Sequence, residues 1–320
     1  MKTDLLASRH IGINEQDTTV MLRKIGVDSL DELIEKTIPA NIRLKEPLAL
    51  NAPLTEYEFG KHIAELAGKN KLYTTYIGMG WYNTITPAVI QRNVFENPVW
   101  YTSYTPYQTE VSQGRLEALL NFQTVISDLT AMPLANCSLL DEATAAAEAA
   151  TMMYGLRSRD QQKKGTNVLF VDESIFPQNL AVIQTRVIPQ GMKIQVGNYK
   201  ELEFTPEIFA CIIQYPNASG SVEDYREFVE KAHAANCKVA VDADILSLAL
   251  LLPPGEWGAD IVFGSTQRLG IPLFYGGPSA AYFATRDEYK RNMPGRIIGL
   301  SKDKYGKICY RMALQTREQH

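Results

Sequence analysis

The sequence predicts an α/β protein with a largely parallel sheet in its main domain and a helical arm before it. From residue 114 onward, short apolar segments alternate with amphipathic helical segments. This order is typical of crossover units with helices on both faces of a sheet. The first 70 residues instead carry apolar residues at helical spacing, so we expect an arm over residues 1–70 and a large domain over residues 71–320.

Composition narrows the class of partner. The chain has 320 residues, 45% hydrophobic and 21% charged, which is ordinary for a soluble globular protein. The net charge of −4 gives no reason to expect nucleic acid or a membrane as partner. No secretory signal and no apolar stretch of membrane-spanning length is visible, so a cytoplasmic location is expected. Four cysteines lie at positions without metal-ligand spacing, and we expect reduced thiols and no metal: Cys137, Cys211, Cys237 and Cys309.

The expected arm contains at least two helices. Ser29 and Glu32 have the spacing of a capping box, and residues 55–68 carry apolar residues on one side of a helix. Such an arm packs on a neighbouring protein or forms a small helical layer of the same domain. The sequence leaves both readings open.

Residues 71–114 are rich in aromatic side chains, glycine, proline and threonine. Solvent-exposed connections seldom hold so many rings, because burial stabilises each ring. We therefore expect these rings to meet a core, a subunit interface or a ligand. The candidates for an interface or for the substrate side of a site are Tyr76, Tyr101, Tyr104 and Tyr107.

The elements of the large domain follow in a regular order. Helices are expected at 115–129, 138–153, 177–185 and 224–235, and strands at 167–171, 193–196, 211–214, 238–241, 261–264 and 280–283. Ser138 with Asp141 is expected to cap the alanine-rich second helix. We interpret the acidic pair Asp141 and Glu142 as a cap and a solvated face rather than as catalytic carboxylates.

Ligands of such sheets bind beyond the carboxyl ends of the strands, where Ser138, the turn at 215–217, Asp242 and the segment 265–268 are expected to meet. A pyridoxal phosphate (PLP) site needs a helix start for the phosphate, an aspartate for the pyridine nitrogen and a lysine for the Schiff base. Ser138 and Asp242 stand in the right order for the first two parts. Gln267 stands at the lysine position, and glutamine cannot condense with an aldehyde. Both matching features also have plainer explanations, because serine caps and aspartates after strands are common in α/β proteins.

Other chemistries lack their motifs. Gly78-Met79-Gly80 is too short for a dinucleotide fingerprint, no Walker A segment occurs, and no Gly-x-Ser-x-Gly elbow is present.

Several longer segments resemble the glycine decarboxylase P-protein family of the glycine cleavage system. They are SRHIG at 8–12, YIGMG at 76–80, ENP at 96–98 with WYT at 100–102, YTPYQ at 104–108, SQGRLEALLNFQ at 112–123, SLLDE at 138–142, QYPN at 214–217 and RNMPGRIIG at 291–299. The resemblance covers essentially the whole chain.

The resemblance implies a PLP-dependent transferase-like fold, the aspartate aminotransferase fold type I, for the large domain. It implies an enzyme that decarboxylates glycine and passes the aminomethyl group to the lipoyl arm of H-protein. The family is built from two similar halves, on one chain or as two subunits, and a dimeric assembly is expected. The PLP lysine belongs to the carboxyl-terminal half. This chain resembles the amino-terminal half, so PLP is expected on the other half and none covalently here. We also expect a small domain to follow residue 320 in the complete protein.

The implied roles leave no catalytic residue in this chain. A degenerate cofactor pocket is expected around Ser138, Asp242, Gln267 and Arg268. Two alternatives stay open. A self-sufficient PLP enzyme would need another lysine in the pocket, such as Lys302 or Lys304, whereas a non-catalytic scaffold would bind a regulatory ligand or nothing.

Overall fold

The computed structural model describes residues 6–101, 106–274 and 276–313. The chain divides into two compact units, Met1–Thr74 and Thr75–His320. The boundary expected at residue 70 stays a prediction.

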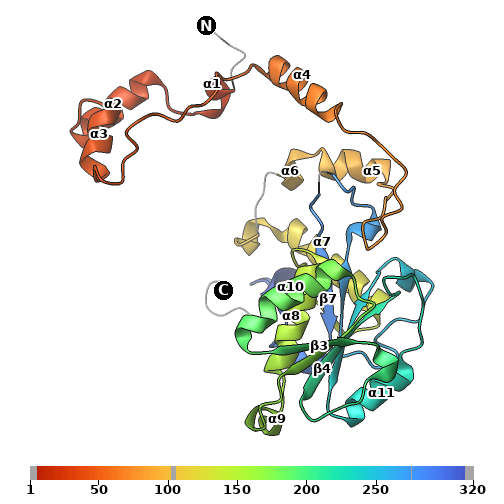
Figure 1. The fold of residues 1–320 in the computed structure, drawn as a ribbon. Helices are drawn as coiled ribbons and strands as arrows, with labels where there is room; N and C mark the ends of the chain where they lie inside the picture. Colours follow the sequence, from red (N-terminus) through yellow and green to blue (C-terminus); the bar gives the residue numbers. More distant parts are fainter. Residues whose placement is uncertain (1–5, 102–105, 275, 314–320) are drawn as a thin grey trace. The chain divides into compact units, whose positions relative to one another are not determined.

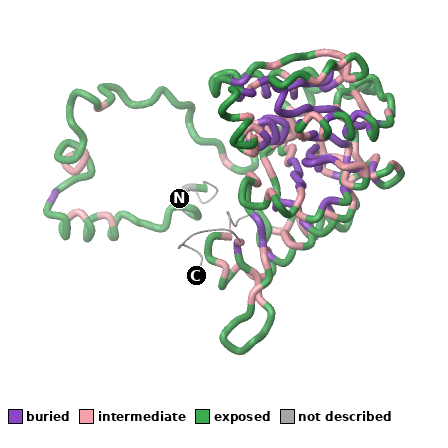
Figure 2. Tube along the Cα trace, turned by 90° about the horizontal axis from the view of Figure 1, so that it is seen from below, coloured by how far each residue is buried: buried purple, intermediate pink, exposed green. Residues whose placement is uncertain are grey.

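The first unit consists of short helices, three of which have an N-cap side chain, and its described residues form no core. Its helices are α1 (Ala7–His10), α2 (Glu15–Ile25), α3 (Leu30–Thr37) and α4 (Glu56–Ala67). Thr55 and Glu58 form a reciprocal capping box at the start of α4. Ser29 caps α3 as expected, but the Glu32 carboxylate accepts the backbone N–H of Asp28 rather than that of Ser29. Among the described residues of this unit Val27 alone is buried, and Figure 2 shows the segment as almost entirely exposed.

The second unit contains a seven-stranded sheet with the order β1-β7-β6-β5-β4-β2-β3 (Figure 1). Its strands are β1 (Leu134–Ala135), β2 (Val168–Asp172), β3 (Lys193–Gly197), β4 (Ile208–Tyr215), β5 (Lys238–Ala243), β6 (Ile261–Ser265) and β7 (Ala281–Thr285). Strands β2 to β6 run parallel, whereas β7 pairs antiparallel with β6, and β1 pairs antiparallel with β7. The predicted α/β class with a mainly parallel sheet is confirmed.

Helices cover both faces of this sheet. They are α7 (Gln113–Thr130), α8 (Glu142–Gly155), α9 (Arg159–Lys163), α10 (Pro177–Val187) and α11 (Arg226–Ala234). Alternate residues of β4 enter two separate cores: Ala210 and Ile212 pack with α8 and α10, whereas Cys211 and Ile213 pack with α7 and α11. Burial on both faces explains why this strand is apolar along its whole length.

The start of α8 corrects one prediction. The N-cap is Asp141, whose side chain accepts the N–H of Thr144 at 2.7 Å, and Ser138 is exposed and lies outside the helix. The reason is that the backbone before Asp141 is held by distant carbonyls: the N–H of Cys137 donates to Arg296 and the N–H of Leu139 donates to Ala281.

A second, two-stranded sheet was absent from the sequence predictions. Strands β8 (Ile297–Lys302) and β9 (Ile308–Ala313) form an antiparallel hairpin. Ile298 and Met312 pack against Leu116 of α7. Short helical pieces complete the unit: α5 (Ala88–Ile90), the π-helical η1 (Gln91–Phe95), α6 (Pro98–Tyr101), and the 3₁₀ turns η2 (Thr109–Val111), η3 (Ile188–Gln190), η4 (Tyr199–Glu201), η5 (Ser247–Ala249), η6 (Gln267–Leu269) and η7 (Asp287–Tyr289). Within the described part of the chain, no helix combines the length and apolar character needed to cross a membrane.

Candidate functional site

The carboxyl edge of the central strands carries a cluster of buried polar groups. Glu142 is the first residue of α8, Asn179 lies in the first turn of α10, and Asp242 lies near the end of β5. The parallel order of β4, β5 and β6 places the end of β5 in the middle of the sheet. Polar groups from three elements therefore meet where ligands of this fold class usually bind.

A single amide group holds two carboxyl groups together. Asn179 Nδ2 donates to Glu142 Oε1 at 2.9 Å and to Asp242 Oδ2 at 2.7 Å. Burial raises the pKa of the Asp242 carboxyl well above its usual range, and the nearby negative charge of Glu142 raises it further. Burial likewise raises the pKa of Glu142, against hydrogen bonds from Asn179 and from the backbone N–H of Ser265. Burial and the repulsion between the two carboxylates therefore both favour the protonated form of this pair.

The part that Glu142 plays in this cluster was not predicted from the sequence. Part of the residue stays exposed, but both oxygens of its carboxylate accept hydrogen bonds, one from the buried Asn179 side chain and one from the backbone N–H of Ser265. The expectation of a solvated face was therefore wrong for Glu142, whereas Asp141 is the cap that was expected. An acidic residue directly after a cap is common at helix starts, so its local sequence carried no signal of the distant partner Asn179.

The Gln267 side chain links two backbone segments. Its Nε2 donates to the carbonyls of Tyr82 at 3.2 Å and Ile271 at 2.8 Å, and the residue is buried. Next to it, the Arg268 guanidinium lies 3.3 Å from the Asp244 carboxylate and over the ring of Tyr82. Both residues thus tie the segment around Tyr82 to the edge of the sheet.

The four residues expected to form the degenerate pocket do not share one cavity. Gln267 lines a cavity of about 420 Å³, and Asp242 and Arg268 line a neighbouring one of about 190 Å³. Glu142 lines both. Ser138 lines a different cavity of about 670 Å³, together with Arg115 and Arg296. The prediction that Ser138 marks the phosphate end of the pocket was therefore wrong, because the helix begins after Asp141.

The residues at this edge do not fit covalently bound PLP. No lysine lines the two cavities among the described residues. At the start of α8, where a phosphate would need free N–H groups, the Asp141 carboxylate already accepts the N–H of Thr144 at 2.7 Å, and Glu142 adds a second carboxyl group. Asp242, the expected partner of a pyridine nitrogen, is engaged by Asn179. The alternative lysines also lie elsewhere: Lys302 ends β8, and Lys304 lies in the turn of the hairpin, beside Tyr305.

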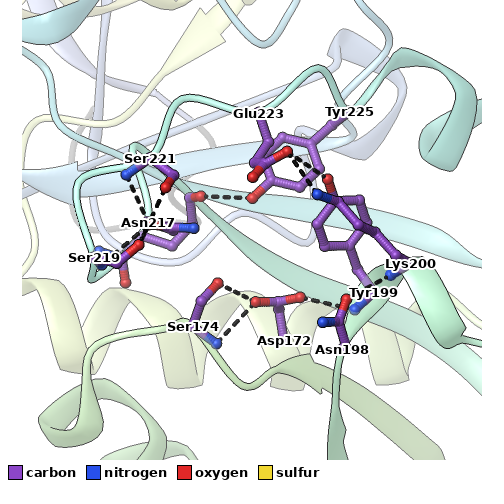
Figure 3. A network of polar contacts seen from close by, with 11 residues as sticks. Asp172, Ser174, Asn198, Tyr199, Lys200, Asn217, Ser219, Ser221, Glu223 and Tyr225 are labelled. Atoms are coloured by element: carbon purple, nitrogen blue, oxygen red, sulfur yellow. Dashed lines mark hydrogen bonds and ion pairs between the residues drawn. The ribbon is translucent and has the colours of Figure 1, made fainter.

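A second polar cluster, at the ends of β2 to β4, is satisfied internally (Figure 3). Asp172 accepts the N–H groups of Ser174 and Tyr199 at 2.8 and 3.0 Å, and the Glu223 carboxylate binds Tyr199 and Lys200. Because each of these groups has a partner in the protein, the cluster supports the loops of this edge.

The aromatic segment remains largely uncovered in this chain. The exposed fractions are 92% for Tyr76, 63% for Tyr101 and 53% for Tyr107. Arg296 donates to the Tyr107 hydroxyl at 3.2 Å and lies over its ring. Tyr104 lies outside the described residues. The alternative that these three rings are buried in a core of this chain is therefore wrong. Their roles at an interface or against a ligand stay predictions.

The family model for the glycine cleavage system P-protein matches residues 8–320. The chain belongs to this family. A P-protein crystal structure, glycine decarboxylase in inhibitor-bound form, superimposes with a TM-score of 0.86 and 32% identity, over 95% of this chain and 69% of that one. The PLP-dependent transferase-like fold expected from the resemblance is thereby confirmed.

Curated relatives agree with the P-protein assignment. The glycine dehydrogenase (decarboxylating) of Bacteroides thetaiotaomicron is 85% identical over 320 residues, covering all of this chain and 34% of the relative. The enzyme of the same name from Flavobacterium johnsoniae is 58% identical, again over all of this chain and 34% of the relative. The chain thus spans about a third of the length of these relatives. Within the described residues, no group of three or more His, Cys, Asp or Glu side chains could hold a metal ion.

Proposed function

We propose that this chain is the amino-terminal part of a glycine dehydrogenase (decarboxylating), and that it supports catalysis without carrying the cofactor. The observation that carries the proposal is the 85% identity to a relative of that name, together with Gln267 at the expected lysine position. In the complete protein, PLP on the other half supplies the electron sink for loss of the carboxylate. The residues of this chain contribute packing and surface to that half.

The proposed reaction uses glycine and a lipoyl H-protein. Glycine loses its carboxyl group as CO2, and the aminomethyl group bonds to one sulfur of the lipoyl disulfide while the other sulfur becomes a thiol. We place the complete protein in the cytoplasm as a dimeric assembly. Within this chain, we infer an arm over residues 1–70 and a large domain over residues 71–320.

The test is release of labelled CO2 from carboxyl-labelled glycine by the complete protein. We expect release to require both PLP and a lipoyl H-protein. Consumption of another amino acid, with glycine left intact, would contradict the proposed substrate.

The same assay tests the aromatic side chains. Tyr107 is half-exposed and held by Arg296, so its ring is presented for contact with the other half. Tyr107→Ala is expected to lower the rate by about tenfold, the effect of losing roughly 1.4 kcal/mol at an interface residue. Tyr305→Ala, which removes an exposed ring from the β8–β9 turn, serves as the control. Equal rates for the two variants would remove Tyr107 from this role.

A further inference from the structure

The segment 81–87 lies against the loop that follows β6, and its residues alternate in burial. Tyr82, Thr84 and Thr86 are half-buried, whereas residues 81, 83, 85 and 87 are exposed. One side of the segment therefore faces the body of the second unit, and the other side faces solvent.

Side-chain hydrogen bonds in both directions hold the inner side of this segment. Gln267 Nε2 donates to the carbonyls of Tyr82 and Ile271. In the opposite direction, Thr84 Oγ1 donates to the carbonyl of Ile271 at 2.9 Å. The residue at the expected lysine position thus takes part in a tether between two backbone segments that are far apart in the sequence.

A glycine brings the two backbones close together at the next contact. Thr86 Oγ1 donates to the carbonyl of Gly270 at 2.6 Å. Gly270 has a φ of +114°, and an added Cβ would lie 3.1 Å from the carbonyl oxygen of Ile85. This contact and the tether together fix the place of Ile85 on the outer side.

The outer side continues into an exposed apolar surface, which we call the outer patch: Ile85, Val89, Phe95 and Phe274. Ile85 is 91% exposed, and Val89 of α5 is 60% exposed. Phe95 of η1 packs edge-on against Phe274 with the ring centroids 6.4 Å apart, and both rings stay exposed. Exposed apolar surface that gathers in one place usually marks a contact with another protein surface.

Composition and chain length indicate what covers the outer patch. Residues 81–95 contain one charged residue, Arg92, and depletion of charge with enrichment in aromatic side chains is typical of the core of a protein–protein interface. The chain covers 34% of its relative from Bacteroides thetaiotaomicron, so about two-thirds of that protein lies outside the matched part. A large part of the complete protein is therefore available to cover the patch.

We propose that the outer patch binds the part of the complete protein outside residues 1–320, and that Gln267, Thr84 and Thr86 position it for this contact. The proposal rests on the proposed function, in which the other half carries PLP. Where a lysine would hold the cofactor, this chain has a glutamine that holds a segment of the docking surface.

The test replaces Ile85 in the complete, PLP-loaded protein by the photocrosslinker p-benzoylphenylalanine and maps the product after irradiation. We expect a crosslink to a peptide outside residues 1–320. The control places the same group at Lys163, which is exposed on α9 at the opposite end of the unit from α5 and α6 (Figure 1), and should give none of this product. No product from Ile85, equal products from both positions, or a product confined to residues 1–320 of the same chain or a second copy would overturn the proposal.

A matched pair of double variants tests the positioning role in the Ile85-labelled protein. Thr84→Val with Thr86→Val removes both hydroxyl donors and keeps the side-chain shape, so the crosslink yield should fall by about threefold to tenfold. Thr84→Ser with Thr86→Ser keeps both hydroxyl groups and should keep the yield. Equal yields for the two double variants would show that the threonines do not position the patch.

The release of labelled CO2 separates this proposal from the proposed function. Release from glycine by the wild-type protein, without an Ile85 product outside residues 1–320, would refute the docking surface and leave the proposed function standing.

Discussion

Replacing Gly264 by alanine is expected to lower the free energy of unfolding by about 3 kcal/mol, at the upper end of overpacking effects. A Cβ at this position of β6 would lie 2.3 Å from the carbonyl oxygen of Ala243 and 3.0 Å from the Tyr282 hydroxyl. These two groups form a buried hydrogen bond of 2.6 Å. The added methyl group would sit on that bond, and neither the backbone of β5 nor the fully buried Tyr282 has room to move.

The measurement is the thermal midpoint of the chain, followed by circular dichroism. A loss of this size corresponds to a decrease of roughly 6–12 °C for a domain of this length. Gly197→Ala is the matched control, because its Cβ would meet only Phe170 Cε2 at an ordinary 3.7 Å. Similar midpoints for the two variants would show that β5, β6 and β7 are less tightly packed at Gly264 than described.

Asp242→Asn is expected to stabilise the chain at alkaline pH by about 1–3 kcal/mol, the usual cost of a buried unsatisfied polar group. Asparagine keeps an oxygen for Asn179 Nδ2, and its own NH2 group can donate to the orphan Asn179 Oδ1. It also removes a carboxyl group whose ionisation is opposed by burial and by Glu142.

The pH dependence has a definite sign. The folded state raises the pKa of the Asp242 carboxyl, so it keeps a proton that the unfolded chain loses above its usual pKa near 3.8. Wild-type stability should therefore fall as pH rises from that value toward the raised folded pKa. Urea unfolding from pH 4 to pH 9 should show the gain of Asp242→Asn growing with pH.

Asp172→Asn provides the contrast. Both Asp172 oxygens already accept backbone N–H groups, so an NH2 group there faces a donor and should destabilise at every pH. A constant effect of Asp242→Asn across the pH range would contradict the raised pKa of the Asp242 carboxyl.

The sequence predicted the central sheet because its strands are buried on both faces. A segment such as Ile208–Tyr215 is apolar throughout and needs no knowledge of its neighbours to be recognised. The β8–β9 hairpin was not predicted, because its strands are only partly buried and depend on contacts with α7, which is far away in the sequence.

In the candidate site, too, some residues could be predicted from the local sequence and others depend on distant contacts. The order of the strands was enough to predict that Gln267 stands at the lysine position. Asp242 was predicted because it stands at the end of a strand. Ser138 and Asp141 are equally good caps by chemistry, and the choice between them depends on hydrogen bonds from residues 137 and 139 to distant carbonyls. Glu142 became significant only when the fold brought Asn179 and Ser265 to its carboxylate.

We propose that this chain belongs to a PLP enzyme but does not itself hold the cofactor. The most direct measurement is borohydride reduction of the complete, PLP-loaded protein, followed by peptide mapping of the modified lysine. We expect one phosphopyridoxyl-lysine per complete protein chain, outside residues 1–320. A stoichiometric adduct on a lysine within these residues would contradict the claim and make this chain a cofactor-binding half.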